Sequence, residues 1–285
     1  MTDQAEQLRR KLQDSHAVIP QAKTLAIVSG KGGVGKSNIA INFSLLLAKR
    51  SKKVLLIDLD IGMGNIDILL GTNAKYSISH LFEQKVTFFD MIETGPNCLD
   101  FIAGGSGLNE IFQLNQQKLT FFIQQLEQAV KTYDYIIFDM GAGVTRDTIE
   151  FMKAVDECIL VTTPEPTSIT DAYSMIKHVL MERETAFHVI VNRTRNAKQG
   201  IEVSNRLIGV VKRFLNQSIH PLGSVPDDEA VVNAVIAQEP FVLHQHNSRA
   251  AKALESIAKQ YLNEPVEPTN RSGFIRRLKR IFTER

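Results

Sequence analysis

The stretch Thr24-Leu-Ala-Ile-Val-Ser-Gly-Lys-Gly-Gly-Val-Gly-Lys-Ser-Asn38 decides the fold, because an apolar run breaks there into a glycine-rich loop and then a helical pattern. The loop fits the pattern G-x-x-x-x-G-K-[ST] at its four fixed positions, which are Gly30, Gly35, Lys36 and Ser37. Glycines let successive backbone N–H groups curl around phosphate oxygens, and the following helix presents its positive end to the same charge. We therefore predict a nucleoside triphosphate site, in which Lys36 reaches the β- and γ-phosphates and Ser37 coordinates Mg²⁺.

Two carboxylates follow the second predicted strand, whose apolar core Val54–Ile57 is typical of a parallel strand covered on both faces. Asp58 and Asp60 come at its carboxyl end, where ligands bind in open α/β sheets. We predict that Asp60 orients the attacking water. Asp58, on the opposite side of the strand, is predicted to support Mg²⁺ or its water shell. A helix-capping role remains the alternative for either carboxylate.

A second phosphate-site signal is the segment Tyr133-Asp-Tyr-Ile-Ile-Phe-Asp-Met-Gly-Ala-Gly143, an apolar strand that ends in a carboxylate and glycines. Asp139 is predicted to lie near Mg²⁺. Gly141–Gly143 are predicted to sense whether the γ-phosphate is present. The pattern is weak alone, but it is strong about a hundred residues after a phosphate loop.

Predicted strands alternate with helices along the rest of the chain. Strands are expected at Cys98–Ala103, Glu157–Pro164, Phe187–Asn192 and Ile219–Val225, and helices at Ile78–Gln84, Gln116–Lys131 and Ser248–Leu262. This alternation predicts one α/β domain over residues 23–262, with a doubly wound, mainly parallel sheet. Asn192 and the pair Pro226-Asp227 follow two of these strands, where a base would lie, and an Asn side chain matches an adenine edge. Capping remains the alternative for these residues.

Composition is that of an ordinary globular protein, with 44% hydrophobic and 22% charged residues among 285. The net charge is +2, but the last fifteen residues hold six Lys/Arg and one Asp/Glu, which leaves a body of net charge −3. A net-acidic body argues against extensive nucleic-acid binding. Cys98 and Cys158 lie in apolar runs and are expected to be buried, reduced thiols of a cytosolic protein. No apolar run approaches the ~18 residues needed to cross a bilayer.

Both ends of the chain carry segments outside the predicted domain. Residues 1–22 form a leader with a short helix at Asp3–Leu12, which is either a frayed terminus or a segment that folds onto a partner. Residues 263–270 indicate a proline-rich linker, and residues 271–285 an amphipathic helix. Its apolar face holds Phe274, Ile275, Leu278, Ile281 and Phe282, and its basic face holds Arg276, Arg277, Lys279 and Arg280. The pattern is typical of a membrane-interface helix, and packing on its own domain or in a partner groove is the alternative.

Four segments together resemble the MinD/ParA family of ATPases across residues 24–262: Gly30–Ser37, Asp58–Gly62, Asp139–Gly143 and Thr162–Pro166. A second lysine, Lys31, opens the loop in the deviant form typical of that family. The resemblance implies that ATP and Mg²⁺ bind and that two subunits close face to face over two nucleotides. Lys31 would then reach the phosphates of the partner's ATP, and a solvated cation beside the site is the alternative.

On this interpretation each predicted site residue has a role. Lys31, Lys36 and Asp60 are catalytic, and Ser37, Asp58 and Asp139 hold the metal. The predicted nucleotide contacts are Gly30, Lys31, Gly32, Gly33, Val34, Gly35, Lys36, Ser37, Asn38, Gly141, Asn192, Pro226 and Asp227.

The leader Asp3-Gln-Ala-Glu-Gln-Leu-Arg9 resembles the N-terminal motif of the FlhG family (also called YlxH or FleN), which regulates the number and placement of flagella. The resemblance implies that the leader stimulates the GTPase FlhF through residues that include Gln4, Leu8 and Arg9. It also implies contacts with flagellar switch-ring components. The tail would attach the ATP-bound dimer to the anionic inner face of the cell membrane. We expect a slow ATPase that is otherwise cytoplasmic, with no specific nucleic-acid partner.

Other members of the superfamily are the alternatives. A division-site MinD typically starts close to its first strand and usually has Ser-Pro-Ala-Gly where this chain has Met140-Gly-Ala-Gly143. A DNA-partitioning ParA predicts a basic body and no membrane tail. A metabolic ligase has no use for an amphipathic end, and an iron–sulfur relative needs a cysteine cluster that two distant cysteines cannot supply.

Overall fold

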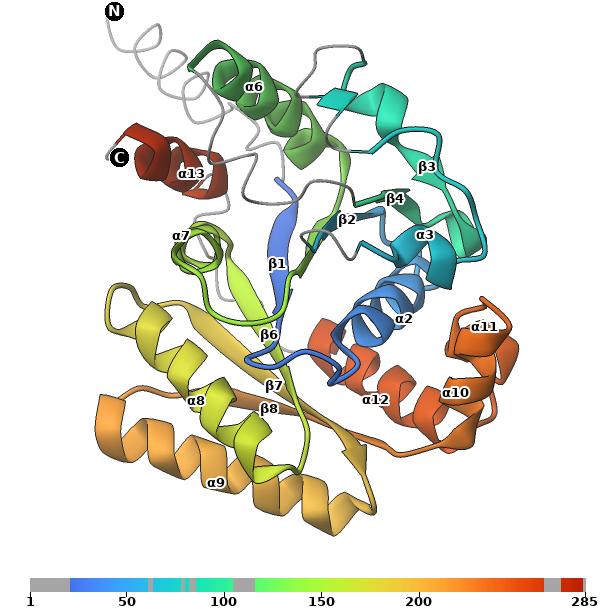
Figure 1. Ribbon diagram of the computed structural model, residues 1–285, viewed down its shortest axis with the longest axis vertical. Coiled ribbons are helices and arrows are strands. Elements are labelled where there is room, and N and C mark those ends of the chain that lie inside the picture. The colour runs from blue at the N-terminus through green and yellow to red at the C-terminus, as the bar shows by residue number, and fades with distance from the viewer. Residues whose placement is uncertain are drawn as a thin grey trace, which may run out of the picture.

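The computed structural model describes residues 21–60, 64–77, 80–81, 86–104, 116–263 and 273–283. The leader residues Gln4, Leu8 and Arg9, most of the predicted linker and most of the predicted helix Ile78–Gln84 lie outside these ranges. The centre of the fold is an eight-stranded sheet in the order β3-β4-β2-β5-β1-β6-β7-β8 (Figure 1). Neighbouring strands pair parallel, except that β3 runs antiparallel to β4. The predicted doubly wound, mainly parallel sheet is confirmed.

The strands are β1 Lys23–Val28, β2 Val54–Leu59, β3 Glu93–Thr94, β4 Asp100–Ile102, β5 Tyr135–Met140, β6 Glu157–Thr162, β7 Ala186–Thr194 and β8 His220–Pro226. The helices are α2 Lys36–Ala48, α3 Ile66–Leu69, α6 Gln116–Thr132, α7 Arg146–Ala154, α8 Pro166–Leu180, α9 Ala197–Leu215, α10 Glu229–Ile236, α11 Phe241–His244, α12 Arg249–Asn263 and α13 Gly273–Thr283. Two 3₁₀ turns, η1 Phe89–Met91 and η2 Pro96–Cys98, flank β3.

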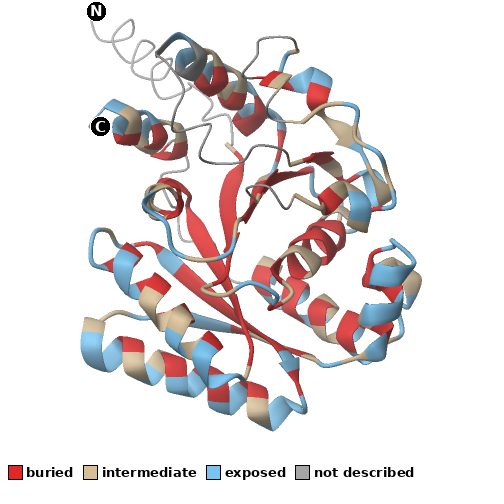
Figure 2. Ribbon diagram, viewed as in Figure 1, coloured by how far each residue is buried: buried red, intermediate tan, exposed pale blue. Residues whose placement is uncertain are grey.

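Helices cover both faces of the sheet. α2, α10, α11 and α12 pack on one face, and α6, α7, α8, α9 and α13 pack on the other (Figure 1). Each face has its own buried cluster of aliphatic and aromatic side chains, so the central strands are buried (Figure 2). Every residue of β1, β2 and β6 is buried, which explains why their sequences are apolar runs rather than alternating patterns.

The sequence analysis did not anticipate helices α7 and α9. Each begins at a polar cap: the Thr145 hydroxyl accepts a hydrogen bond from the Thr148 N–H, and Asn196 caps α9 in the same way. Along α9 the residues Val203, Leu207 and Val211 recur at intervals of four and are buried against the sheet. Both helices therefore carry ordinary local signals, and they cover the face that also receives α13.

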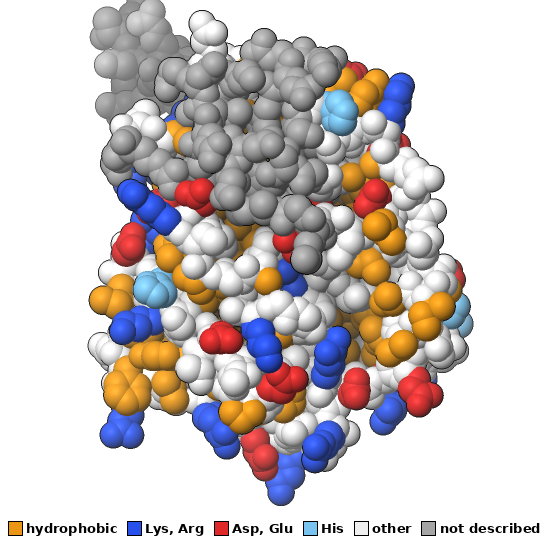
Figure 3. All heavy atoms as spheres, viewed as in Figure 1, with side chains coloured by type: hydrophobic (Ala, Val, Ile, Leu, Met, Phe, Trp, Pro, Cys, Tyr) orange, Lys and Arg blue, Asp and Glu red, His pale blue; other side chains and the backbone are white. Residues whose placement is uncertain are grey.

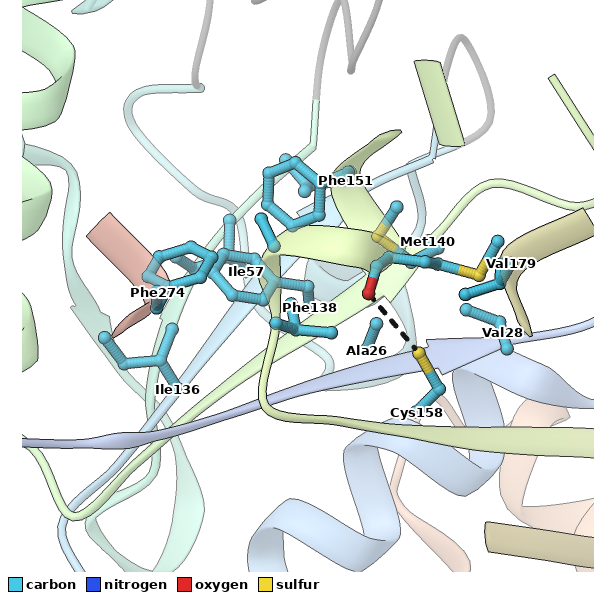
Figure 4. Close-up of a cluster of buried hydrophobic side chains, with 14 of the residues drawn as sticks. Ala26, Val28, Ile57, Ile136, Phe138, Met140, Phe151, Cys158, Val179 and Phe274 are labelled. Atoms are coloured by element: carbon cyan, nitrogen blue, oxygen red, sulfur yellow. Dashed lines mark hydrogen bonds between the residues drawn. The ribbon is translucent and has the colours of Figure 1, made fainter. Parts of the chain in front are cut away.

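The prediction of two buried cysteines is wrong for one of them. Cys158 is fully buried in β6, and its thiol donates to the Met152 carbonyl at 3.9 Å (Figure 4). Cys98 is exposed. The strand expected from Cys98 begins only at Asp100, and Cys98 instead ends the turn η2.

The C-terminal helix α13 packs on its own domain, which is one of the two alternatives that the sequence left open. Phe274 and Leu278 are completely buried, and the Phe274 ring centre lies 5.6 Å from that of Phe138 and 6.2 Å from that of Phe151 (Figure 4). The apolar face predicted for a membrane is therefore turned to the protein in this conformation. The residues that stay exposed are Arg276, Lys279, Arg280 and Thr283, while Ile275 and Phe282 are half-buried. Among the helices of the described residues, none is long and apolar enough to cross a bilayer.

Candidate nucleotide-binding site

A cavity of about 520 Å³ opens at the carboxyl end of the sheet, beside the loop that follows β1. β1 lies between β5 and β6, so the strand order reverses at this point, where doubly wound folds bind their ligands. The predicted residues that line the cavity are Gly32, Gly33, Gly35, Lys36, Ser37, Asn38 and Asp60. The wall also includes Ala142, from the segment Gly141–Gly143 that was predicted to sense the γ-phosphate, and five residues that the sequence analysis missed: Ser29, Asn65, Leu69, Arg193 and Val235.

The surface around this cavity is mixed in character. In the face shown in Figure 3, basic and acidic side chains lie side by side over the phosphate loop, and hydrophobic side chains gather over α3 and α10. Four of the exposed hydrophobic residues belong to these two helices: Ile68, Val232, Val235 and Ile236. The cavity therefore has a charged side at the loop and an apolar side at α3 and α10.

The phosphate loop has the backbone shape that its glycines were predicted to allow. Gly33 and Gly35 have φ of +77° and +88°, the left-handed region that glycine adopts without a Cβ penalty. A Cβ on Gly30 would lie 2.4 Å from the carbonyl carbon of Asp171 in α8, so that position also requires glycine. Gly35 directly precedes α2, whose first turn lines the cavity and leaves its backbone N–H groups available to an anion.

The residues predicted to contact the base do not line the cavity; they are Asn192, Pro226 and Asp227. The buried Asn192 amide donates to the Val34 carbonyl at 2.8 Å, and a Cβ on Gly35 would lie 2.4 Å from the same amide nitrogen. Asn192 therefore holds the phosphate loop in shape. Arg193, the next residue, lines the cavity and has φ of +55°, which is uncommon for a residue other than glycine.

Lys36 lies at the centre of a charge cluster. Its side chain is 6% exposed, and Nζ lies 2.6 Å from Oδ1 of Asp139 and 3.7 Å from Oδ2 of Asp60. Asp139 is completely buried. Because a buried charge without a partner is strongly destabilising, the Asp139 carboxylate holds Lys36 in this conformation. Phosphate oxygens at the loop would compete with Asp139 and Asp60 for the same ammonium group.

The oxygens around Asp139 fit a magnesium ion. Burial raises the pKa of Asp139, and the neighbouring Lys36 charge opposes that rise. Oδ2 of Asp139 and the Ser29 hydroxyl are buried and have no hydrogen-bond partner among the described residues. The Ser37 hydroxyl lies 3.3 Å from Nζ of Lys36. Hard oxygen donors of this kind, with unused lone pairs, suit Mg²⁺ or the waters that it keeps.

Asp58 is occupied by backbone donors. Its Oδ1 accepts from the Asp60 N–H at 2.9 Å, and its Oδ2 accepts from the N–H groups of Asn65 and Ile66 at 3.0 and 3.3 Å. Burial and the nearby Asp139 charge raise the pKa of Asp58 to about 6. These bonds favour the capping role that the sequence left open for Asp58. Its carboxylate bonds to both ends of the segment between β2 and α3, and this segment carries Asp60 and Asn65 to the cavity.

Gly141–Gly143, the segment predicted to sense phosphate, contacts the phosphate loop. The Gly143 N–H donates to the Ser29 carbonyl at 3.1 Å, and Gly143 has φ of +90°. A Cβ on Gly32 would lie 3.8 Å from the Cβ of Ala142. The two segments are therefore close enough that a ligand in the loop would meet the segment after β5.

Lys31 lies at the surface beside the cavity and is paired with the start of α8. Its Nζ lies 2.8 Å from Oε2 of Glu165 and 3.4 Å from the Thr167 hydroxyl, and its side chain is 42% exposed. Hydrogen bonding to Lys31 lowers the pKa of Glu165. Lys31 thus makes no contact with the cluster of Lys36, Asp139 and Asp60. The sequence analysis did not connect Lys31 with Glu165.

The phosphate loop has a buried lysine, and carboxylates stand opposite it at the ends of β2 and β5. This combination defines a P-loop nucleoside triphosphatase. Comparison with known proteins agrees. The family model described as "ParA: NUBPL iron-transfer P-loop NTPase" matches residues 21–262. The chain is 32% identical over 266 residues to the antiactivator FleN of Pseudomonas aeruginosa, with 92% of each chain covered. It is 33% identical to the flagellum site-determining protein YlxH of Helicobacter pylori, over 83% of this chain and 80% of that one.

Solved structures show the same architecture. A chain of the MinC:MinD cell division protein complex of Aquifex aeolicus superposes with a TM-score of 0.69 at 27% identity, over 87% of this chain and 99% of that one. MinD of Pyrococcus horikoshii complexed with Mg-ADP superposes with a TM-score of 0.70 at 23% identity. The chain belongs to the ParA family of P-loop NTPases and, within it, to the FleN/YlxH group, and it is an ATPase.

Proposed function

We propose that this chain is an Mg²⁺-ATP-dependent switch that regulates the number and placement of flagella. The description of YlxH as a flagellum site-determining protein supports the flagellar role, because YlxH and the antiactivator FleN both align with most of the chain. The observation that carries the switch is the docked α13, an amphipathic helix whose apolar residues Phe274 and Leu278 are fully buried on the body. A helix with these two faces can exchange the protein surface for a membrane surface.

ATP would bind at the phosphate loop and replace the carboxylates as the partner of Lys36. Lys36 would leave Asp139 for the β- and γ-phosphates, and Asp139 and Ser37 would then hold Mg²⁺. When bound, the metal neutralises phosphate charge. Asp60, which lines the cavity and is only partly buried, would orient the attacking water. Oδ2 of Asp139, which has no hydrogen-bond partner in the described parts of the chain, supports this assignment of the metal site.

Two ATP-bound copies would pair through the face that carries the cavity. Lys31 supports this step because it sits at that face, partly exposed and clear of its own Lys36 cluster. In a pair it would leave Glu165 and reach the partner's phosphates. Surface ion pairs are worth ~0–1 kcal/mol, so the Lys31–Glu165 bond is easily exchanged.

Pairing would favour membrane attachment by two tails at once. One tail binds weakly, since α13 must first give up the burial of Phe274 and Leu278 on the body, which is worth about 1.5–3 kcal/mol for each side chain. Each exposed cation near an anionic surface contributes about 1 kcal/mol, and two linked tails bind far more tightly than one. Arg276, Lys279 and Arg280 are already exposed on the docked helix.

Co-sedimentation with anionic liposomes tests the proposal in the presence of ATP, of ADP and of no nucleotide. The full chain should pellet mainly with ATP. Ile275→Asp, on the half-buried flank of α13, should abolish pelleting, whereas Ile201→Asp, at an exposed isoleucine of α9, should not. Equal pelleting of the two variants would contradict a membrane role for the tail.

Stimulation of FlhF by the leader is tested separately. The GTPase rate of FlhF should rise when the full chain is added. It should rise less with Gln4→Ala, and Gln7→Ala serves as a matched control in the same segment. No stimulation by the unaltered chain would remove this part of the proposal and would leave the ATPase assignment intact.

A further inference from the structure

A second cavity, of about 430 Å³, lies between α6 and the tail helix α13, which are neighbours in Figure 1. Its wall comes from the end of α6, from one flank of α13 and from the first described residue of the chain. The lining residues are Gln21, Glu127, Val130, Lys131, Ile275, Arg276 and Lys279. An ion pair of 2.5 Å between Nζ of Lys279 and Oε1 of Glu127 joins the two helices at this wall. The cavity therefore exists only while α13 is docked.

The main chain enters the body at the same wall. The Ala22 N–H donates to the Val130 carbonyl at 2.7 Å, and Ala22 is completely buried in the cluster that also holds Phe274. Gln21, one residue earlier, lines the cavity, and the twenty residues before it lie outside the described ranges. Because the chain advances at most ~3.6 Å per residue, the Cα atoms of residues 18–20 must lie within about 11 Å of the Cα of Gln21.

The residues directly before Gln21 match the cavity in polarity. Val18-Ile19-Pro20 is an apolar run, and Val130 and Ile275 are apolar members of the wall. Proline restricts the residue before it to extended backbone. Ile19 therefore loses little conformational freedom when it docks, which favours binding of this short segment.

The charges are complementary as well. Glu127 is the one carboxylate among the described lining residues, and three exposed cations accompany it: Lys131, Arg276 and Lys279. Residues 13–20 carry one acidic side chain, Asp14, and no lysine or arginine. The preceding run Arg9–Lys11 is wholly basic and would be repelled by the same wall. The charge pattern selects residues 13–20, rather than the leader helix, as the occupant.

We propose that residues 13–20 of this chain occupy the cavity, with Ile19 against Val130 and Ile275, and thereby hold the leader to the docked tail. This inference rests on the proposed release of α13 and names a second consequence of that release. When α13 leaves, Ile275 and two of the cations leave with it, and the leader loses half of its site. Release of the tail therefore frees the leader for its partner, and a partner that takes the leader favours release of the tail.

Hydrogen exchange of residues 273–283 in the nucleotide-free full chain tests this proposal. Ile19→Lys should speed exchange of the tail at least ~10-fold, because the docked state loses an apolar contact and gains a fourth cation beside three. Exchange in β1 should stay unchanged, because Ile19 precedes the body. Leu8→Lys, in the leader helix, is the matched control and should match the unaltered chain. Unchanged or slower tail exchange in Ile19→Lys would overturn the inference.

The same experiment at two protein concentrations identifies the occupant. Equal rates are expected, since the occupant belongs to the same chain. Tail exchange that slows as the concentration rises would mean that a second copy fills the cavity, and it would overturn the inference.

A cysteine probe tests the coupling in the reverse direction. Cys98 is exposed and Cys158 is buried, so Cys98→Ser gives a background in which an added thiol can be labelled selectively. In that background Ile19→Cys should react with a maleimide ~10-fold faster when Phe274→Ala also removes a buried ring of α13, because coupling is reciprocal. Leu8→Cys should react at one rate in both. Equal labelling of Ile19→Cys with and without Phe274→Ala would contradict the proposal.

The proposed function fails differently. In that case the tail of the unaltered chain would exchange equally with and without a non-hydrolysable ATP analogue, whatever residue stands at position 19.

Discussion

Phe274→Ala should undock the tail helix without unfolding the domain. Phe274 is completely buried, with ring centres of Phe138 and Phe151 at 5.6 and 6.2 Å. Replacing a core Phe by Ala costs ~3–5 kcal/mol, and the lower end applies here because α13 can leave rather than retain an empty cavity. A loss of ~3 kcal/mol corresponds to about a 150-fold increase in tail opening. Hydrogen exchange of residues 273–283 in nucleotide-free protein measures that opening.

The distribution of the effect is as informative as its size. Exchange should accelerate in α13 and remain unchanged in β1 and β5, because the tail opens as a local unit. Arg276→Ala is the matched control on the same helix, since Arg276 is exposed. Unchanged protection of α13 in Phe274→Ala would refute the packing argument. Equal acceleration in α13 and the central strands would show that the tail is not separable from the domain.

Three further predictions concern the charged residues. In nucleotide-free protein Lys36→Met leaves Asp139 buried and unpaired, so urea unfolding should show a free energy of unfolding that is ~3–5 kcal/mol lower. Adding Asp139→Leu should recover most of that loss. Equal instability of the single and double variants would contradict the pairing of Lys36 with Asp139. Burial raises the pKa of Glu157, but His188 and Lys23 outweigh it and lower the pKa to about 2. The resulting ~3 kcal/mol of stability is present above pH 4.5 and is lost as pH falls toward 2, so Glu157→Gln should destabilise at pH 7 and much less near pH 2 in urea unfolding. Asp60→Ala should abolish ATP turnover while fluorescent-nucleotide titration shows unchanged binding, and turnover at the unaltered rate would reject its role.

The parts of the fold that follow from local chemistry could be predicted from the sequence. The phosphate loop and the strands with continuous apolar runs carry their signals in their own sequence. The structure has these elements at the predicted positions. The helix α9 carries an equally local signal that was overlooked, since Val203, Leu207 and Val211 recur on one face. The strand β3 has only two residues, too few for any period to appear.

Contacts between distant segments could not be predicted in the same way. Asn192 holds Val34 from 158 residues away, and Arg277 reaches Asp156 from the tail, so neither bond leaves a trace in its own segment. The two faces of α13 were evident from periodicity. Whether the apolar face meets lipid or protein depends on a surface built by α6 and α7, which no local pattern describes.

The measurement that tests the account most directly is the mass of the full chain in solution, by light scattering, with Mg²⁺ and a non-hydrolysable ATP analogue. We expect a species of twice the 31.9 kDa chain mass with the analogue and single chains with ADP or no nucleotide. Lys31→Ala should stay single throughout, since the lysine proposed to bridge the two copies is gone. Single chains of the unaltered protein at micromolar concentration with the analogue bound would contradict the claim that ATP pairs two copies.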